Sequence, residues 1–193
     1  MADSALLVMD VQRSIVDRFD DDSGYLPRLR AAVDAARAAG VPVIHVVVGF
    51  RPGHPEISPR NRTFSAAARS GGFVEGAPGS EIHPDVAPRP DEVVITKRRV
   101  SAFAGSDLDM VLRAGGTDTL VLTGIATSGV VLSTLRQAAD LDYALTVLSD
   151  GCLDADPEVH RVLTEKVFPR QAEVLSVTEW IKSTAVPARR LTG

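Results

Sequence analysis

An acid and a base each lie at the end of a short apolar stretch of the chain. Asp10 ends the stretch LLVMD, and Lys97 follows VVIT. A carboxyl group beside an ammonium group can transfer protons when burial and neighbouring charges adjust their pKa values. The segment GIATSGV, residues 124–130, follows another apolar stretch and has the small and polar residues of a turn. Asp10, Lys97 and this turn are therefore the first candidates for a chemical site.

The segments that must position these residues predict a parallel α/β sheet. Short stretches rich in Val, Leu and Ile alternate with stretches of helical period, which is typical of strands buried on both faces by crossover helices. We expect a three-layer αβα fold around a central, mostly parallel sheet of about six strands. Because ligands bind at the carboxyl ends of such strands, Asp10, Lys97 and residues 124–130 should meet there. The expected strands are residues 6–10, 43–48, 93–96, 119–123, 145–148 and 173–176.

Helix signals fill the intervals between these strands. Gly40 is a stop signal after the first apolar-periodic stretch, and Ser106 can cap a later one. A helix that begins near Ser128 would direct its dipole and free N–H groups at the candidate site, where they favour a carboxylate ligand. The expected helices are residues 25–39, 107–114, 128–139 and one that begins at Asp156 and Pro157.

Residues 49–90 differ from the rest, since they are dense in Gly, Pro, Arg and Ser and show little period. We predict a long loop region that covers a site or a subunit contact, and a partly disordered surface loop is the alternative. The chain is long enough for one domain, which we assign to residues 1–182. Residues 183–193 have no apolar period and are expected to form a flexible tail.

Composition excludes several classes of partner. The net charge of -4 and the pI near 5.6 give no general attraction to nucleic acid or anionic lipid. We expect neither partner and no membrane span, and the N-terminus lacks the pattern of a signal peptide. A single cysteine, Cys152, cannot form an internal disulfide, which favours a cytoplasmic location.

Three motifs occur in a fixed order, each at the end of an expected strand: LLVMDVQ, VVITKRRVSAF and GIATSGVVLSTLRQAA. Together they resemble the isochorismatase-like hydrolases over nearly the whole chain. The resemblance implies a parallel sheet flanked by helices. It also implies an Asp, Lys and Cys triad, which many members use to hydrolyse amides through a thioester. Asp10 and Lys97 match the first two positions, but the cysteine position falls on Val130.

Valine at residue 130 removes one mechanism, because an alkyl side chain can neither attack a carbonyl nor carry an acyl group. Thioester catalysis there is excluded, whereas proton transfer between Asp10, Lys97 and a substrate is not. Family members that act on the vinyl ether of isochorismate lack the cysteine and resemble this chain in retaining Asp and Lys. By this resemblance Asp10 would protonate the enol-ether carbon, and water would complete the hydrolysis.

Further roles are assigned from the same motifs. The resemblance implies that the Ile125–Ala126 peptide is cis and helps to aim N–H groups at a developing oxyanion. It also implies that Phe103, in the segment SAF, lines the pocket or a subunit boundary. We predict that Gln12, Phe103, Ile125, Ala126 and Gly129 contact the substrate. The expected partners are a small-molecule substrate and further copies of this chain, as a homodimer or a higher homo-oligomer.

Three functions fit this sequence. The first is a hydrolase that acts on a small, carboxylate-bearing molecule through Asp10 and Lys97. The second is a catalytically inactive relative that binds or senses a small molecule, which explains Val130 equally well. The third is an amide hydrolase that uses Cys152, provided that its sulfur reaches Lys97 or Asp10.

No cofactor or metal is expected. Some relatives bind zinc through an Asp and two His residues, but the four histidines here are far apart in the sequence, without a D-x-H cluster. We interpret His45, within an apolar stretch, as a packed core residue. The other three are His54, His83 and His160.

Overall fold

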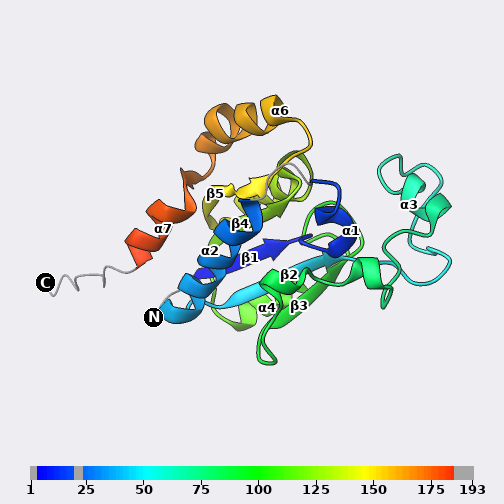
Figure 1. Ribbon diagram of the computed structural model, residues 1–193, viewed down its shortest axis with the longest axis horizontal. Helices are drawn as coiled ribbons and strands as arrows, with labels where there is room; N and C mark the ends of the chain where they lie inside the picture. The colour runs from blue at the N-terminus through cyan, green and yellow to red at the C-terminus, as the bar shows by residue number, and fades with distance from the viewer. Residues whose placement is uncertain (1–3, 20–23, 185–193) are drawn as a thin grey trace, which may run out of the picture.

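The computed structural model describes residues 4–19 and 24–184, which form one sheet with helices on both faces (Figure 1). Six strands pair in the order β3-β2-β1-β4-β5-β6, and every pairing between them is parallel. The expected α/β class and three-layer arrangement are thus confirmed. The strands are β1 (Ser4–Met9), β2 (Val43–Val48), β3 (Val93–Lys97), β4 (Thr119–Ile125), β5 (Ala144–Leu153) and β6 (Glu173–Leu175).

Each face of the sheet is covered by its own apolar cluster. On one face, α2 (Tyr25–Ala39) and α7 (Val177–Thr184) pack against the strands, and on the other α4 (Leu108–Ala114) and α5 (Leu132–Asp140) do so. Alternate residues of β1 enter opposite clusters, which is the period-two pattern of a strand buried on both sides. The remaining helices are α1 (Arg13–Val16), α3 (Ser65–Ser70) and α6 (Pro157–Val162).

The expected and observed boundaries agree where a local stop signal exists. Helix α2 has the predicted bounds, and Gly40 ends it with a φ of 71°. Asp156 caps α6 by accepting hydrogen bonds from two backbone N–H groups. The helix expected at 128–139 begins later, at Leu132, because Gly129 has non-helical dihedrals inside a wide turn, η3 (Thr127–Val131). Strand β5 is longer than expected and includes Cys152.

Residues 49–90 are more ordered than the expected loop. They contain α3 and two short 3-10 turns, η1 (Pro78–Ser80) and η2 (Pro84–Val86). Phe50 and Phe64 pack edge to face with ring centroids 5.2 Å apart. Arg98, next to the end of β3, pairs with Glu75 at 2.6 Å, which ties this segment to the strand that carries Lys97. The predicted loop region is therefore present, with a few short helical turns and a small core of its own.

The end of the described chain differs from the expected domain boundary. Helix α7 continues to Thr184, so the tail expected at 183–193 begins inside a helix, and residues 185–193 lie outside the described residues. Among the helices of the described residues, none is long and apolar enough to cross a bilayer.

Gly124 allows β4 to lie close against the end of β1. Its φ is +139°, which L-residues with a side chain rarely adopt. A Cβ at this position would lie 2.2 Å from the carbonyl oxygen of Met9, the residue before Asp10. Glycine is therefore required by both the dihedral angle and the space.

We expect Gly124→Ala to lower the free energy of unfolding by about 3 kcal/mol or more, because the methyl group must displace backbone. Gly116→Ala is the matched control, since Gly116 also has positive φ but a methyl group there would meet no atom within 4 Å. Its cost should be about 1 kcal/mol. Chemical denaturation measures both, and equal costs would contradict the proposed clash.

Candidate active site

Asp10 and Lys97 meet at the carboxyl ends of their strands. The Nζ atom of Lys97 lies 2.9 Å from Oδ2 of Asp10, and the two residues are only 1% and 6% exposed. Their strands are not neighbours, because β2 lies between β1 and β3. Asp10 has a φ of 57° and so departs from the regular strand geometry that ends at Met9. The predicted acid–base pair is therefore a buried ion pair that spans β2.

The two oxygens of Asp10 have different surroundings. Oδ2 accepts the ammonium of Lys97, whereas Oδ1 is buried without a hydrogen-bond partner among the described residues. Burial raises the pKa of the Asp10 carboxyl above its ordinary value, and the charge and hydrogen bond of Lys97, together with the backbone of Val48, oppose this rise without cancelling it. A protonated carboxyl can donate from Oδ1 while Oδ2 stays on Lys97. Oδ1 of Asp10 is therefore the atom that can bond to a ligand or to water.

Gln12 holds the chain around this pair. It is fully buried, and its Nε2 donates to the carbonyl oxygens of Val48 at 3.0 Å and Ser80 at 2.8 Å. Its Oε1 accepts the N–H of Val48 at 3.0 Å. These bonds join the end of β1 to the end of β2 and to the turn η1. The amide is thus engaged inside the protein, and its predicted contact with substrate stays a prediction.

The segment expected to cover a site does lie against the end of β1. The N–H of His83 donates to the carbonyl of Val11 at 2.9 Å, and that of Arg13 donates to Glu81 at 2.9 Å. Gln12 and Ile82 form an isolated antiparallel bridge. Residues 80–83 therefore run alongside the three residues that follow Asp10.

The turn after β4 contains the cis Ile125–Ala126 peptide that the resemblance implies. The carbonyl of Ala126 accepts the N–H groups of Gly129 at 3.0 Å and Val131 at 3.3 Å. The N–H of Ser128 donates to Asp154 Oδ2 at 2.7 Å. Several donors expected to face a substrate are therefore engaged within the protein, and the anion at this turn is Asp154 itself.

Asp154 and His160 were not identified from the sequence. His160 Nδ1 lies 2.8 Å from the hydroxyl of Thr127, so both residues hold the turn from the side of β5 and α6. The position of Asp154 just after β5 was a usable signal under the rule of strand carboxyl ends. His160 lies on a helix, and no local pattern indicates that its ring reaches a turn 33 residues away.

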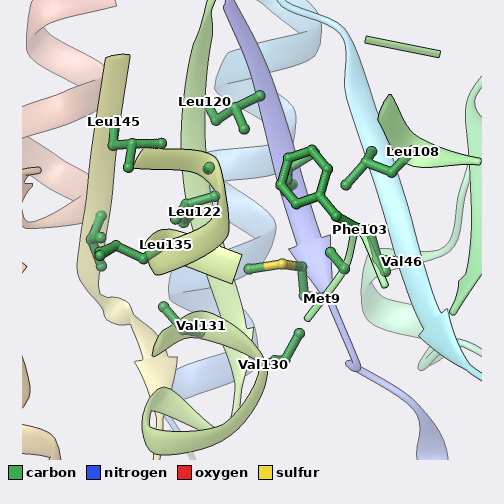
Figure 2. Close-up of a cluster of buried hydrophobic side chains, with 14 of the residues drawn as sticks. Met9, Val46, Phe103, Leu108, Leu120, Leu122, Val130, Val131, Leu135 and Leu145 are labelled. Atoms are coloured by element: carbon green, nitrogen blue, oxygen red, sulfur yellow. The ribbon is translucent and has the colours of Figure 1, made fainter. Parts of the chain in front are cut away.

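Val130 lies in apolar surroundings on the α4 and α5 face of the sheet. It is 2% exposed and belongs to the cluster that contains Met9 and Ile95, which lie one and two residues before Asp10 and Lys97. Figure 2 shows Val130 on the turn after β4, at the same end of the cluster as Met9. Phe103 is also in this cluster, 8% exposed, with its ring 5.9 Å from that of Tyr143. The cysteine position of the resemblance therefore holds a packed alkyl group.

Cys152 is buried and poorly suited to attack a substrate. Its sulfur donates to the carbonyl of Leu122 at 3.8 Å, and burial raises the pKa of its thiol to about 12. At pH 7 the thiol is then protonated rather than ionised. The geometry gives Cys152 the role of a small buried side chain.

The histidines lie in separate surroundings. His45 is 1% exposed with Nε2 3.4 Å from Glu92, which confirms the expectation of a packed residue, and His54 contacts the carbonyl of Gly72 at 2.8 Å. Within residues 4–19 and 24–184 no group of three or more His, Cys, Asp or Glu side chains could hold a metal ion.

Comparison with known proteins shows which family this chain is similar to. The family model described as "Isochorismatase domain" matches residues 4–179. The ureidoacrylate amidohydrolase RutB of Stutzerimonas stutzeri is 34% identical over 207 residues, which cover 94% of this chain and 80% of the relative. This chain belongs to the isochorismatase family.

Other members support the assignment. The isochorismatase family protein YwoC of Bacillus subtilis is 31% identical over 179 residues, covering 93% of each chain. The solved structure of an isochorismatase family protein from Desulfovibrio vulgaris has a TM-score of 0.85 and 28% identity, covering 96% of this chain and all of that one. Hydrolase activity in general is thus supported for this family member.

The free thiol gives a direct test of the site. We expect Cys152 of the native protein to react with a disulfide reagent such as DTNB at least ~10³-fold more slowly than in guanidinium, because the sulfur is buried and protonated. Absorbance of the released thiolate measures both rates, and the denatured chain is the control because it exposes the same thiol. Comparable rates would restore Cys152 as a candidate nucleophile.

Proposed function

We propose that this protein hydrolyses a small molecule by proton transfer from Asp10, with water rather than a protein thiol as the nucleophile. The observation that carries the proposal is the unpartnered Oδ1 of Asp10 beside the Lys97 ion pair. A buried polar atom without a partner costs about 1–3 kcal/mol, and this cost is removed when a ligand group or water bonds to it. Membership of a hydrolase family supports a reactive rather than a structural use of this oxygen.

The charge distribution favours an acid. Burial raises the pKa of Asp10, so its protonated form persists at a higher pH than for an exposed carboxyl. Lys97 holds Oδ2, which leaves Oδ1 as the atom that carries the proton to the substrate. An alkyl neighbour at residue 130 adds no competing proton donor.

An enol ether suits this acid. Asp10 would donate its proton to the enol-ether carbon, and the ether oxygen would share the resulting positive charge. Water would then add to the carbon that bears the ether oxygen and lose a proton to the Asp10 carboxylate. Collapse of the hemiketal would give a ketone and an alcohol, and Asp10 would again be protonated. Lys97 would stabilise the carboxylate between the two transfers.

The proposed substrate class does not depend on a substrate carboxylate. The turn after β4 was expected to receive it, but the N–H of Ser128 is bound by Asp154. The reacting enol ether, and not a carboxylate, therefore defines the substrate class that we propose.

We expect Asp10→Asn to lower kcat for a small vinyl ether by about 10²–10⁴-fold, the usual contribution of general acid catalysis. The wild-type rate should fall as the pH rises through the raised pKa of Asp10, because the acid form is then lost. Product ketone measured by proton NMR gives both results.

Asp142→Asn is the matched control, since Asp142 is an exposed residue with positive φ that asparagine tolerates. It should keep the wild-type rate. An Asp10→Asn variant that remains folded and equally active would contradict the role of Asp10.

A non-catalytic binding protein is the second candidate. It is favoured by Val130 and by the near-complete burial of Asp10 and Lys97, which leaves little open access. In that case a vinyl ether would raise the melting temperature of the wild type without being consumed, and the size of the increase would follow its concentration.

We expect Val130→Cys to add amide hydrolysis to this scaffold. By the family resemblance, the new thiol would complete an Asp, Lys and Cys triad with Asp10 and Lys97. Val130→Ala is the control for the lost volume, and both changes should cost about 1–2 kcal/mol of stability. Ammonia or amine release from a panel of small amides is the measurement. A folded Val130→Cys variant without such activity would show that residue 130 is not placed for attack.

A further inference from the structure

The ammonium of Lys97 has a second partner besides Asp10. Its Nζ donates to the carbonyl oxygen of Arg99 at 3.1 Å, so the chain turns back toward the lysine side chain just after β3 ends. A lysine side chain is flexible, and a second hydrogen bond restricts the positions that its ammonium can take. The carbonyl of Arg99 therefore helps to keep this ammonium at 2.9 Å from Oδ2 of Asp10.

The side chain of Arg99 holds the turn that carries this carbonyl. Nη1 of its guanidinium donates to the carbonyl of Arg98 at 2.6 Å, and Nη2 donates to the carbonyl of Glu56 at 3.0 Å. Residues 98–100 are bends that follow the strand, so the ladder of the sheet does not hold them. The fork of an arginine suits such a contact with two acceptors. The guanidinium thus joins the turn after β3 to residue 56.

The segment that contains Glu56 is anchored to the same strand end. The N–H of Gly49 donates to the carbonyl of Lys97 at 3.2 Å, and the guanidinium of Arg98 donates to the carbonyl of Gly49. The side chain of Glu56 is mostly buried, and its carboxylate pairs with Arg51 at 2.7 Å. The carbonyl of residue 56 therefore belongs to an ordered part of the chain.

We propose that Arg99 is a positioning residue for the Asp10–Lys97 pair. Its guanidinium holds the turn after β3 against the carbonyl of Glu56, and its own carbonyl holds the Lys97 ammonium on Asp10. Arg99 acts through Lys97 and need not touch a substrate. Its effect on turnover rests on the function proposed above for Asp10, whereas its effect on the pair itself does not.

Loss of this contact should change the acidity of Asp10 in a defined direction. The charge and hydrogen bond of Lys97 lower the pKa of Asp10 and so oppose the rise that burial causes. When the ammonium moves away from Oδ2, this opposition weakens and the pKa of the carboxyl rises further. General loosening of the fold would instead admit water and move the pKa down toward its ordinary value. The sign of the shift therefore separates positioning from a merely structural role.

Carbon-13 NMR of the full chain with labelled aspartate carboxyls measures the pKa of Asp10, and Asp10→Asn identifies its signal. We expect Arg99→Gln to raise this pKa by about half a unit or more. Arg99→Lys keeps the charge but not the fork, and should raise the pKa by a similar amount. Arg51→Gln removes an equal charge from the same segment, keeps both guanidinium bonds of Arg99, and should leave the pKa unchanged.

The proposal is overturned by an unchanged or lowered pKa of Asp10 in Arg99→Gln. A wild-type pKa in Arg99→Lys, or an equal rise in Arg51→Gln, would assign the effect to charge alone and also overturn it. If Arg99→Gln does not fold, the milder Arg99→Lys decides.

Turnover gives a separate readout. Where the wild type hydrolyses a vinyl ether, the pH at which its rate falls should move upward in Arg99→Gln together with the pKa of Asp10. A raised pKa in this variant, with no hydrolysis by the wild type, would support the role of Arg99 and contradict only the proposed function.

Discussion

The buried ion pair between Asp10 and Lys97 is the constraint on which the rest of the site depends. Removing two charges from water is costly, and the attraction between them offsets that cost only when their geometry is maintained. Here the pair spans an intervening strand, so β1, β2 and β3 must keep their register for the Nζ–Oδ2 distance of 2.9 Å to hold. Gln12 contributes by joining the ends of β1 and β2 through Val48.

Close backbone contacts surround this pair on both sides. Met9 and Gly124 approach so closely that β4 adds a wall directly beside Asp10. On the other side, residues 80–83 bond to the residues that follow Asp10. Enclosure on both sides keeps water from Asp10, and this desolvation raises the pKa of its carboxyl. The fold thus sets the acidity of the site through backbone packing more than through other charges.

Sequence patterns predicted the parts of the fold whose signals are local. The strands, helix α2 with Gly40 and helix α6 with Asp156 have periodicity or caps within a few residues. Asp10 and Lys97 were identified because both lie at strand ends of a parallel sheet. Their separation by β2 was not foreseen, since strand order depends on how crossover connections pack and not on the strands' own residues.

The parts that were missed depend on contacts between distant residues. Residues 49–90 are ordered by pairs such as Arg98 with Glu75 and Gln12 with Ser80, and a composition rich in Gly and Pro does not reveal such pairs. The regular part of helix α5 begins at Leu132 rather than near Ser128, because Ala126 and Asp154 accept N–H groups of the preceding turn. Ala126 and Asp154 both lie outside helix α5, so the residues of the helix itself do not reveal where it begins.

Val130 is consistent with the acidity of Asp10. A carboxylate that activates a thiol must be ionised in order to accept its proton, and a lowered pKa would increase its ionised fraction. Here burial moves the pKa of Asp10 in the opposite direction, and the neighbouring apolar cluster, with Met9 and Ile95, is extended by the valine. The alkyl group adds to the apolar cluster that contains Met9, the residue before this buried carboxyl. Burial accounts for the raised pKa of Asp10, and a buried valine at residue 130 is compatible with the same dry environment.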